Sequence, residues 1–265
     1  MKRIIVIIFI IGSAIVFLFH RPLKDALLAP AFQVVAPTPA ATSAHRVFYT
    51  SFESIKDFAG FYISPQNHLN GASHDQSAEK VKSGTYAHKG WIYAANPPST
   101  LFVNNNHRGY PTIQLYKLPG GGFKTPALVE FWVWLDVNLL PGEWFSFATL
   151  DHTTSDSWDP VLVNLSDKGF VHLMHVPHNG DAVWNFQTPT VKFPMREWVK
   201  LSVCIDFTKN GETKVWQNGT LVSSAKTGKE GLLTQAHFGL YAPPSLSSGV
   251  VYNDDLIITE GGCAL

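Results

Sequence analysis

The fold is decided by the stretch Trp198-Val199-Lys200-Leu201-Ser202-Val203-Cys204-Ile205-Asp206-Phe207. One face of it holds Val199, Leu201, Val203, Ile205 and Phe207. This alternation predicts a β-strand that is buried on one side. Another strand is expected at 214–217, followed by Asn218-Gly219 and a third strand at 220–222. Asn-Gly between two such runs predicts a type I′ hairpin, because both turn residues need positive φ.

The stretches 130–136 and 237–242 alternate in the same way, and a last strand is expected at 250–259. Phe238 and Leu240 are expected to face the core, and His237 and Tyr241 to face away from it. Gly, Pro and Asn interrupt the chain at short intervals, and no helical periodicity follows the first 21 residues. We therefore predict an all-β fold, a two-sheet antiparallel sandwich.

The N-terminal segment predicts export. Lys2 and Arg3 precede an apolar run at 4–19, with no small-x-small cleavage site close behind it. We expect residues 1–21 to form an uncleaved signal anchor, a single transmembrane helix that leaves the rest of the chain outside the cytoplasm. Secretion after signal cleavage is the alternative. Residues 22–45, rich in Pro and Ala, predict an extended linker, and residues 46–265 the sandwich domain.

The composition favours an uncharged, hydroxylated ligand. Twenty basic residues balance twenty acidic ones, and no basic block appears, so we expect no nucleic acid partner. Charged residues make up only 15% of the chain, which contains 8 Trp. A weakly charged surface rich in aromatic rings suits a glycan, because rings stack on sugar C–H faces and polar groups bind hydroxyls.

Aromatic and polar side chains alternate on the non-core faces of the expected strands. We predict that these side chains form one open sugar-binding platform. Its expected members are the rings of Trp132, Trp134, Trp198, His237 and Tyr241, with Glu130 and Lys200 as polar contacts. The alternative is that covering loops bury the rings, which would leave a structural or protein-binding module.

The two cysteines are expected to stay unpaired. Cys204 falls in a strand in the middle of a sheet, and Cys263 lies in the C-terminal tail. In an oxidising compartment they have the chemistry to pair, but these positions argue against it.

Three histidines in seven residues, His172, His175 and His178, raise the question of a metal site. On a strand, His172 and His175 point to opposite faces, and His178 follows Pro177 in a turn. We therefore expect no metal cluster, and at most one functional imidazole. Asp151, Asp156 and Asp159 crowd one loop. Asx turns explain them, and a structural calcium ion is the weaker alternative. We expect no other cofactor.

The chain resembles the concanavalin-like lectin/glucanase superfamily, especially laminin-G-like modules and jelly-roll polysaccharide lyases. The resemblance spans nearly all of residues 47–260. The segments that carry it are Phe52-Glu53 with Ser83-Gly84-Thr85-Tyr86-Ala87, Glu130-Phe131-Trp132-Val133, Trp198-Val199-Lys200-Leu201 with the Asn218-Gly219 hairpin, and Asn253-Asp254-Asp255-Leu256-Ile257-Ile258. It implies a concanavalin-like jelly roll, but one fold hosts many activities.

Glucanases of this superfamily need two carboxylates at close range. Glu130 and Asp136 share a strand face but lie about 20 Å apart along it. Glycoside hydrolysis needs about 5 to 10 Å, so this chemistry is disfavoured.

The lyases offer a closer comparison. Their Lys-x-Gly-x-Tyr strand, which supplies a catalytic Tyr, is similar to His237-Phe238-Gly239-Leu240-Tyr241, with His in place of Lys. The resemblance implies Tyr241 as the base of a β-elimination. It also implies His172 or His175, together with Arg108, as the groups that neutralise a uronate carboxylate.

We therefore predict an exported, membrane-tethered jelly-roll protein that binds a polysaccharide. The first alternative is a uronate polysaccharide lyase, which is favoured over a hydrolase if the chain is an enzyme. The second alternative is a structural or protein-binding laminin-G-like module.

Overall fold

The computed structural model describes residues 45–54, 61–62, 71–95, 105–152, 159–177, 183–185, 191–227 and 230–263. The predicted anchor at 1–21 and nearly all of the predicted linker at 22–45 lie outside these ranges. Within them, no helix has both the length and the apolar character needed to cross a bilayer. The described elements are antiparallel strands and one short 3-10 helix, η3 (Leu115–Lys117).

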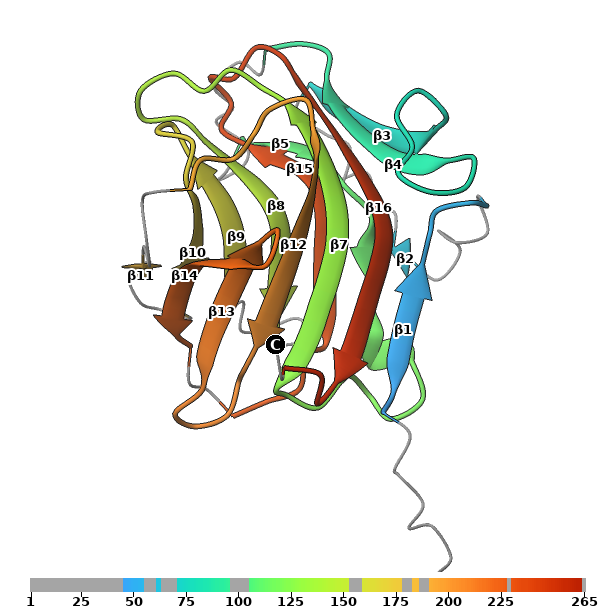
Figure 1. Ribbon diagram of the computed structural model, residues 1–265, viewed down its shortest axis with the longest axis vertical. Coiled ribbons are helices and arrows are strands. Elements are labelled where there is room, and N and C mark those ends of the chain that lie inside the picture. The colour runs from blue at the N-terminus through green and yellow to red at the C-terminus, as the bar shows by residue number, and fades with distance from the viewer. Residues whose placement is uncertain are drawn as a thin grey trace, which may run out of the picture. The chain divides into compact units, whose positions relative to one another are not determined.

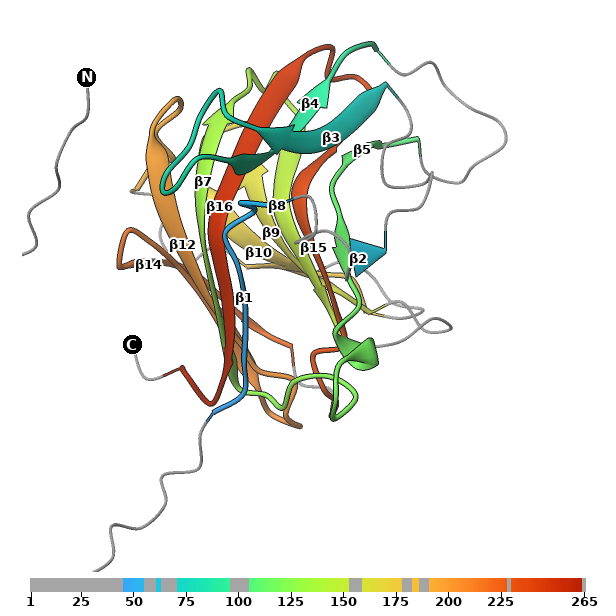
Figure 2. The ribbon, with the colours of Figure 1, turned by 90° about the vertical axis from the view of Figure 1, so that its right-hand side faces the viewer.

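The strands form the two layers of a sandwich (Figures 1 and 2). Among the described residues each sheet has eight strands. Sheet A runs in the order β14 (Thr220–Lys226), β13 (Glu212–Gln217), β12 (Trp198–Ile205), β7 (Ala127–Asp136), β16 (Gly249–Glu260), β4 (Ala87–Ile92) and β3 (Ala72–Ser77), and β1 (Val47–Thr50) also pairs with β16. Sheet B runs in the order β11 (Val183–Asn185), β10 (Val171–His175), β9 (Val161–Ser166), β8 (Trp144–Asp151), β15 (Gln235–Ala242), β6 (Thr112–Ile113) and β2 (Phe61–Tyr62), and β5 (His107–Gly109) also pairs with β15. The predicted all-β, two-sheet antiparallel sandwich is confirmed.

The core lies between the sheets, where the alternation of the sequence placed it. Along β7, buried residues alternate without a break with half-buried ones. β12 pairs with β7 so that Leu201 lies opposite Phe131 and Val199 opposite Val133, and all four side chains are buried. Sheet B supplies the facing layer, in which Phe238 packs edge-on against Phe131 with ring centroids 5.1 Å apart. Burying such aliphatic and aromatic side chains contributes roughly 1.5–3 kcal/mol each.

The Asn218-Gly219 hairpin is confirmed. The two residues join β13 to β14 and have φ values of 49° and 82°. The Asn218 side-chain oxygen also accepts a hydrogen bond from the Lys200 amide at 2.9 Å. The turn therefore connects to β12 as well as closing its own hairpin.

Cys204 and Cys263 form a disulfide, with Cα atoms 5.3 Å apart, so the expectation of free thiols is wrong. Leu128 of β7 lies between the two strands concerned, opposite Cys204 of β12 on one side and Thr259 of β16 on the other. After β16 the chain turns at Gly261, where φ is 68° and the amide donates to the Pro126 carbonyl at 2.9 Å. The tail thus folds back over Leu128 to reach Cys204.

Candidate functional site

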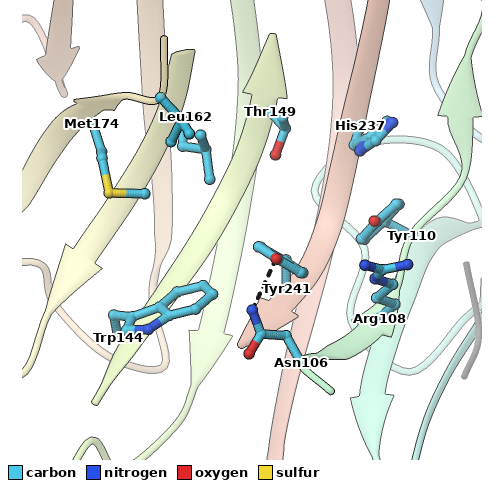
Figure 3. A pocket seen from close by; sticks show the side chains of 10 residues that line it. Asn106, Arg108, Tyr110, Trp144, Thr149, Leu162, Met174, His237 and Tyr241 are labelled. Carbon is cyan, nitrogen blue, oxygen red and sulfur yellow. Dashed lines mark hydrogen bonds between the residues drawn. The ribbon is translucent and has the colours of Figure 1, made fainter. Parts of the chain in front are cut away.

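A groove with a volume of about 530 Å³ lies on the outward face of sheet B. Figure 3 shows its side chains, which come from β5, β8, β9, β10 and β15 and the segments beside them. They are Asn106, Arg108, Tyr110, Trp144, Thr149, Leu162, Met174, Val176, His237 and Tyr241. The set divides into a polar half beside β5 and an apolar half on β8–β10.

β15 places Tyr241 and His237 in this groove. Phe238 and Leu240 are buried in the core, so their neighbours in the alternation face outward, as predicted. Gly239 has φ of 138°, and a Cβ there would lie 2.7 Å from the Gly109 carbonyl oxygen and 2.8 Å from His88 Cε1. Only glycine therefore lets β5 approach β15 this closely.

Tyr241 lies at the centre of the groove. Asn106 Nδ2 donates a hydrogen bond of 2.8 Å to the Tyr241 hydroxyl (Figure 3). The Trp144 ring lies 5.1 Å from the Tyr241 ring, and the Tyr110 ring meets it edge-on at 6.2 Å. These contacts fix the phenol with its hydroxyl at the boundary between the two halves.

Arg108 is the cation of the groove. It lies directly opposite Tyr241 in the β5–β15 pairing, which puts both side chains on the same face. Arg108 is half-buried, and no carboxylate among the described residues forms an ion pair with it. Its Nε is buried without a hydrogen-bond acceptor in the described part of the chain. A guanidinium held in this way favours an anionic ligand, because ligand binding would supply the missing partner.

His237 is held in its neutral form. Burial, and to a lesser extent the positive charge of Arg108, lowers the pKa of its imidazole to about 3. The ring stacks on Tyr110 with centroids 4.6 Å apart, and its Nε2 lies 3.1 Å from Gln235 Nε2. Since the Gln235 amide nitrogen is a donor, His237 Nε2 acts there as an acceptor.

The other half of the groove is an apolar wall. Trp144 of β8, Leu162 of β9 and Met174 of β10 face it (Figure 3). Val176, just after β10, also lines it. A sugar bound next to Arg108 and Tyr241 would extend over this wall, where the ring of Trp144 offers a stacking surface.

The predicted single platform is wrong, because its residues belong to different sheets. His237 and Tyr241 lie on β15 of sheet B. Glu130, Trp132 and Trp134 on β7, and Trp198 and Lys200 on β12, lie on the outward face of sheet A. For each strand, the side chains that face outward were predicted correctly. The alternation does not tell which of the two sheets a strand joins.

The sheet A part of the predicted platform is partly covered by its own chain. Lys82 Nζ lies 4.0 Å from the Trp132 ring centroid, and Lys80 Nζ lies 5.3 Å from that of Trp134. Asp254 holds this loop between β3 and β4, because its Oδ2 accepts from the Lys82 and Ser83 amides at 2.9 and 3.1 Å. The two rings therefore already have cationic neighbours.

The two predicted polar contacts bind each other. Lys200 Nζ lies 2.7 Å from Glu130 Oε1, which also accepts from the Ser202 hydroxyl at 2.9 Å.

The histidines of β10 face opposite sides, as predicted, and neither lines the groove. His172 is buried opposite Asn164, and burial lowers the pKa of its imidazole to about 4. His175 Nε2 lies 2.6 Å from Asp159 Oδ1, in the interior. We therefore leave both out of the proposed chemistry. His178 lies outside the described residues.

Asp159 has a structural explanation. Its two carboxylate oxygens face imidazoles, Oδ1 that of His175 and Oδ2 that of His152 at 3.4 Å. Asp151 accepts the Asp159 amide at 3.3 Å, and Asp156 is outside the described residues. In the described ranges, no group of three or more His, Cys, Asp or Glu side chains is arranged to hold a metal ion.

Sequence reasoning identified Tyr241, His237 and Arg108 but missed several other groove residues. Tyr110 follows Arg108 by two residues, so strand parity could have placed them on one face. Trp144 precedes the buried Phe145 on β8, and the same rule could have placed it outward. The same rule could have placed Asn106 on the face of Arg108, and Met174 outward beside the buried Leu173. It could not have brought either residue to the groove, because that depends on the strand order of sheet B.

Comparisons with known proteins add information on the fold. No protein-family model matches the chain, and no curated protein sequence matches it. An endo-beta-1,4-glucuronan lyase from the fungus Trichoderma reesei superposes with a TM-score of 0.58 at 14% identity, covering 80% of this chain and 94% of the lyase. The cellulose induced protein Cip1 superposes with a TM-score of 0.58 at 17% identity, covering 82% of this chain and 100% of Cip1. At these identities the likeness is one of fold, and it agrees with the two-sheet β-sandwich that the sequence resemblance implied.

Proposed function

We propose that this chain is a polysaccharide lyase that binds a uronate-containing glycan in the groove of sheet B and cleaves it by β-elimination. The observation that carries the proposal is the half-buried Arg108, with no acidic partner among the described residues, directly beside Tyr241. The groove offers a cation for a carboxylate next to a hydroxyl able to move a proton. The similarity of fold to a glucuronan lyase supports the same class of substrate.

The proposed reaction assigns each group a role. Arg108 and the Asn106 amide bind the uronate carboxylate, which withdraws electron density from the sugar C5 and makes its hydrogen more acidic. Tyr241, as the base, removes this proton. The electron pair forms a C4–C5 double bond as the C4–O4 bond breaks. Tyr241, which acts as the phenolate and becomes the phenol, then returns the proton to the leaving O4. The products are a new reducing end and an unsaturated uronate.

The test uses the ultraviolet absorbance of the unsaturated product. Full-length protein is incubated with alginate, glucuronan and heparin, and we expect absorbance to rise with at least one of them. Tyr241→Phe should reduce the rate at least about a hundredfold, as expected for loss of a proton-transfer group. Absence of product from all three glycans would contradict the lyase proposal.

A matched pair of variants tests the cation. Arg108→Ala removes the unpaired guanidinium from the groove, and Lys200→Ala removes a cation that is paired with Glu130 on the other sheet. We expect only Arg108→Ala to weaken retention on an alginate affinity gel. Equal retention of the two variants would remove Arg108 from the site.

A second function, glycan binding without cleavage, is favoured by one observation. His237 is the one imidazole among the described groove residues, and its Nε2 already accepts from Gln235. If elimination needs a second proton carrier beside Tyr241, the groove would hold the glycan and leave it intact. Binding without product, lost in Trp144→Ala, would identify this function.

We also propose that the domain is exported and tethered to a membrane by residues 1–21. The cationic start and apolar run support this, and the Cys204–Cys263 disulfide fits an oxidising compartment. Protease treatment of intact cells expressing the full chain should remove the sandwich domain and leave a membrane-bound stub. Protection of the domain until lysis would contradict export.

A further inference from the structure

A second cavity, of about 540 Å³, lies on the outward face of sheet A, where β4, β16 and β7 run side by side. Trp91, Val250 and Asp136 form one row across these three strands, because Val250 is the register partner of both other residues. Lys89 and Tyr252 form the next row. We propose that this cavity binds a neutral oligosaccharide, independently of the groove on sheet B.

The charges of this cavity are balanced in pairs. Lys89 Nζ lies 2.6 Å from Glu79 Oε1, and the Tyr252 hydroxyl donates to Glu79 Oε2 at 2.6 Å. Arg196 Nε lies 3.0 Å from Asp136 Oδ1. Each cation that lines the cavity therefore faces an anion, in contrast to Arg108 in the groove. This cavity offers no net charge to a uronate, so an uncharged ligand suits it better.

The same groups suit sugar hydroxyls. A carboxylate accepts up to about four hydrogen bonds and a guanidinium donates five, so each pair has capacity left for a ligand. The Asn138 side chain adds a donor and an acceptor at the edge. Hydroxyls are both donors and acceptors, and adjacent hydroxyls on a pyranose ring can bridge such paired groups.

An aromatic ring supplies the apolar contact. Trp91 is half-buried in the outward row of β4, and Lys89 Nζ lies 5.4 Å from its ring centroid. Tyr252 lies in the next row, and its ring packs edge-on against the Trp134 ring, with the ring centroids 5.5 Å apart. A flat ring beside balanced polar groups is the combination that binds the C–H face of a neutral sugar.

The proposal is tested by affinity electrophoresis of the full-length protein in gels containing hydroxyethylcellulose, laminarin or xyloglucan. We expect at least one of these neutral glycans to retard the native chain, and Trp91→Ala to weaken that retardation at least tenfold. Trp91→Phe, which keeps a smaller ring, should retain part of it. The matched control is Trp198→Ala, another half-buried ring on the outward face of sheet A but outside the cavity, and it should leave retardation within twofold of native.

A second variant keeps the test decisive if Trp91→Ala is poorly folded. Arg196 is largely exposed and has φ of 62°, a conformation that Asn tolerates. Arg196→Asn should therefore fold normally and weaken retardation by the neutral glycan. Native-like retardation of both Trp91→Ala and Arg196→Asn, or no retardation of the native chain by any of the three glycans, would overturn the proposal.

The result is separable from the proposed lyase function. Alginate retention and product formation should be unchanged in Trp91→Ala, whereas Arg108→Ala should lose alginate retention and keep that on the neutral glycan. If Arg108→Ala weakens retention on both alginate and the neutral glycan while Trp91→Ala weakens neither, the groove binds both glycans and the sheet A cavity is not a glycan site.

Discussion

At the scale of single residues, Arg108 and His237 are coupled through charge. Arg108 contributes to the lowered pKa of the His237 imidazole, second to burial. In the proposed function the same guanidinium would bind an anionic ligand, and its charge adds to the effect of burial on the His237 imidazole. A neutral His237 cannot pair with a uronate carboxylate, so Arg108 provides the positive charge of the groove.

This coupling predicts a shift in titration. Removing the Arg108 charge favours protonation of the imidazole, so the pKa of His237 should rise from about 3 in Arg108→Ala. The pKa should still remain below the unperturbed value of about 6.5, because burial, the larger cause, persists. The measurement is an NMR titration of the His237 ring signals between pH 2 and 8, with His237→Gln used to assign them. An unchanged or lower pKa in Arg108→Ala would contradict the coupling.

A conservative change tests the geometry of the cation. Arg108→Lys keeps the charge but loses the planar fork that binds a carboxylate through two hydrogen bonds. We expect alginate retention intermediate between native and Arg108→Ala, about tenfold weaker than native, which corresponds to about 1.4 kcal/mol. If the lysine variant binds as tightly as native, the site recognises charge alone.

At the scale of elements, β15 determines where the groove forms. Its register with β8 shifts between Phe238 and Tyr241, and Gly239 lies inside this irregularity. β5 pairs with β15 beside Tyr241, and that pairing brings Arg108 to it. The groove therefore depends on one close backbone approach at Gly239.

Gly239→Ala should disturb both stability and binding. The added methyl would meet the Gly109 carbonyl and His88 at less than contact distance, so we expect the free energy of unfolding to fall by about 2–4 kcal/mol. Displacement of β5 should also weaken alginate retention. Urea unfolding measures the first effect. Gly219→Ala is the control, since its φ is also positive but its Cβ would meet open space, and it should cost about 1 kcal/mol and spare binding.

Element-scale features were also the most predictable from sequence. Alternation at 130–136, 198–207 and 237–242 identified the core faces, and Asn218-Gly219 identified a hairpin. Strand order was beyond reach, because alternation has no information on which neighbour a strand pairs with. This is why Tyr241 and Trp134 were assigned to one platform although they lie on different sheets, and why Asn106 and Met174 were missed.

At the scale of the whole molecule, the disulfide closes the end of sheet A. It joins β12 to the tail after β16, across a sequence separation of 59 residues. Sequence reasoning missed it because nothing in the sequence brings a C-terminal tail to a strand in the middle of a sheet. In the structure the turn at Gly261 brings it back over Leu128.

Loss of the disulfide should destabilise the sandwich. Closing a loop of this length restricts the unfolded chain, and we expect Cys204→Ala/Cys263→Ala to lower the free energy of unfolding by about 2–4 kcal/mol. Urea unfolding of the double variant, compared with native protein with and without reductant, measures this. Each single variant should match the double variant, and equal stability of native and double variant would show that the bond contributes nothing.

Buried imidazoles should make the fold sensitive to acid. Burial lowers the pKa of the His88 and His172 imidazoles, that of His172 to about 4. Below about pH 6.5 the unfolded chain therefore binds protons at these two residues that the folded chain does not bind. Each imidazole should therefore reduce the free energy of unfolding by up to about 1.4 kcal/mol per pH unit as the pH falls from 6.5 toward 4. Asp254 acts in the opposite direction, because burial raises the pKa of its carboxyl to about 6.

A variant isolates the contribution of one imidazole. His172→Gln should show a shallower loss of stability between pH 6.5 and 4 than the native chain in urea unfolding at several pH values. Identical pH profiles of the two proteins would show that His172 is not buried in its neutral form.

The pairing of β1 with β16 also has a mechanical consequence. Val47 lies opposite Thr259, and the Glu260 amide donates to the Arg46 carbonyl at 3.0 Å, so the chain enters and leaves the sandwich at one edge of sheet A. Tension transmitted through the segment before Val47 would first load these hydrogen bonds, and then, through the covalent bridge at Cys263, the neighbouring β12. Arg46 also donates to the Pro119 and Gly122 carbonyls, next to the Phe123–Leu233 bridge that precedes β15. A pull from the amino-terminal side would therefore also reach the strand bearing Tyr241 through the Arg46 side chain.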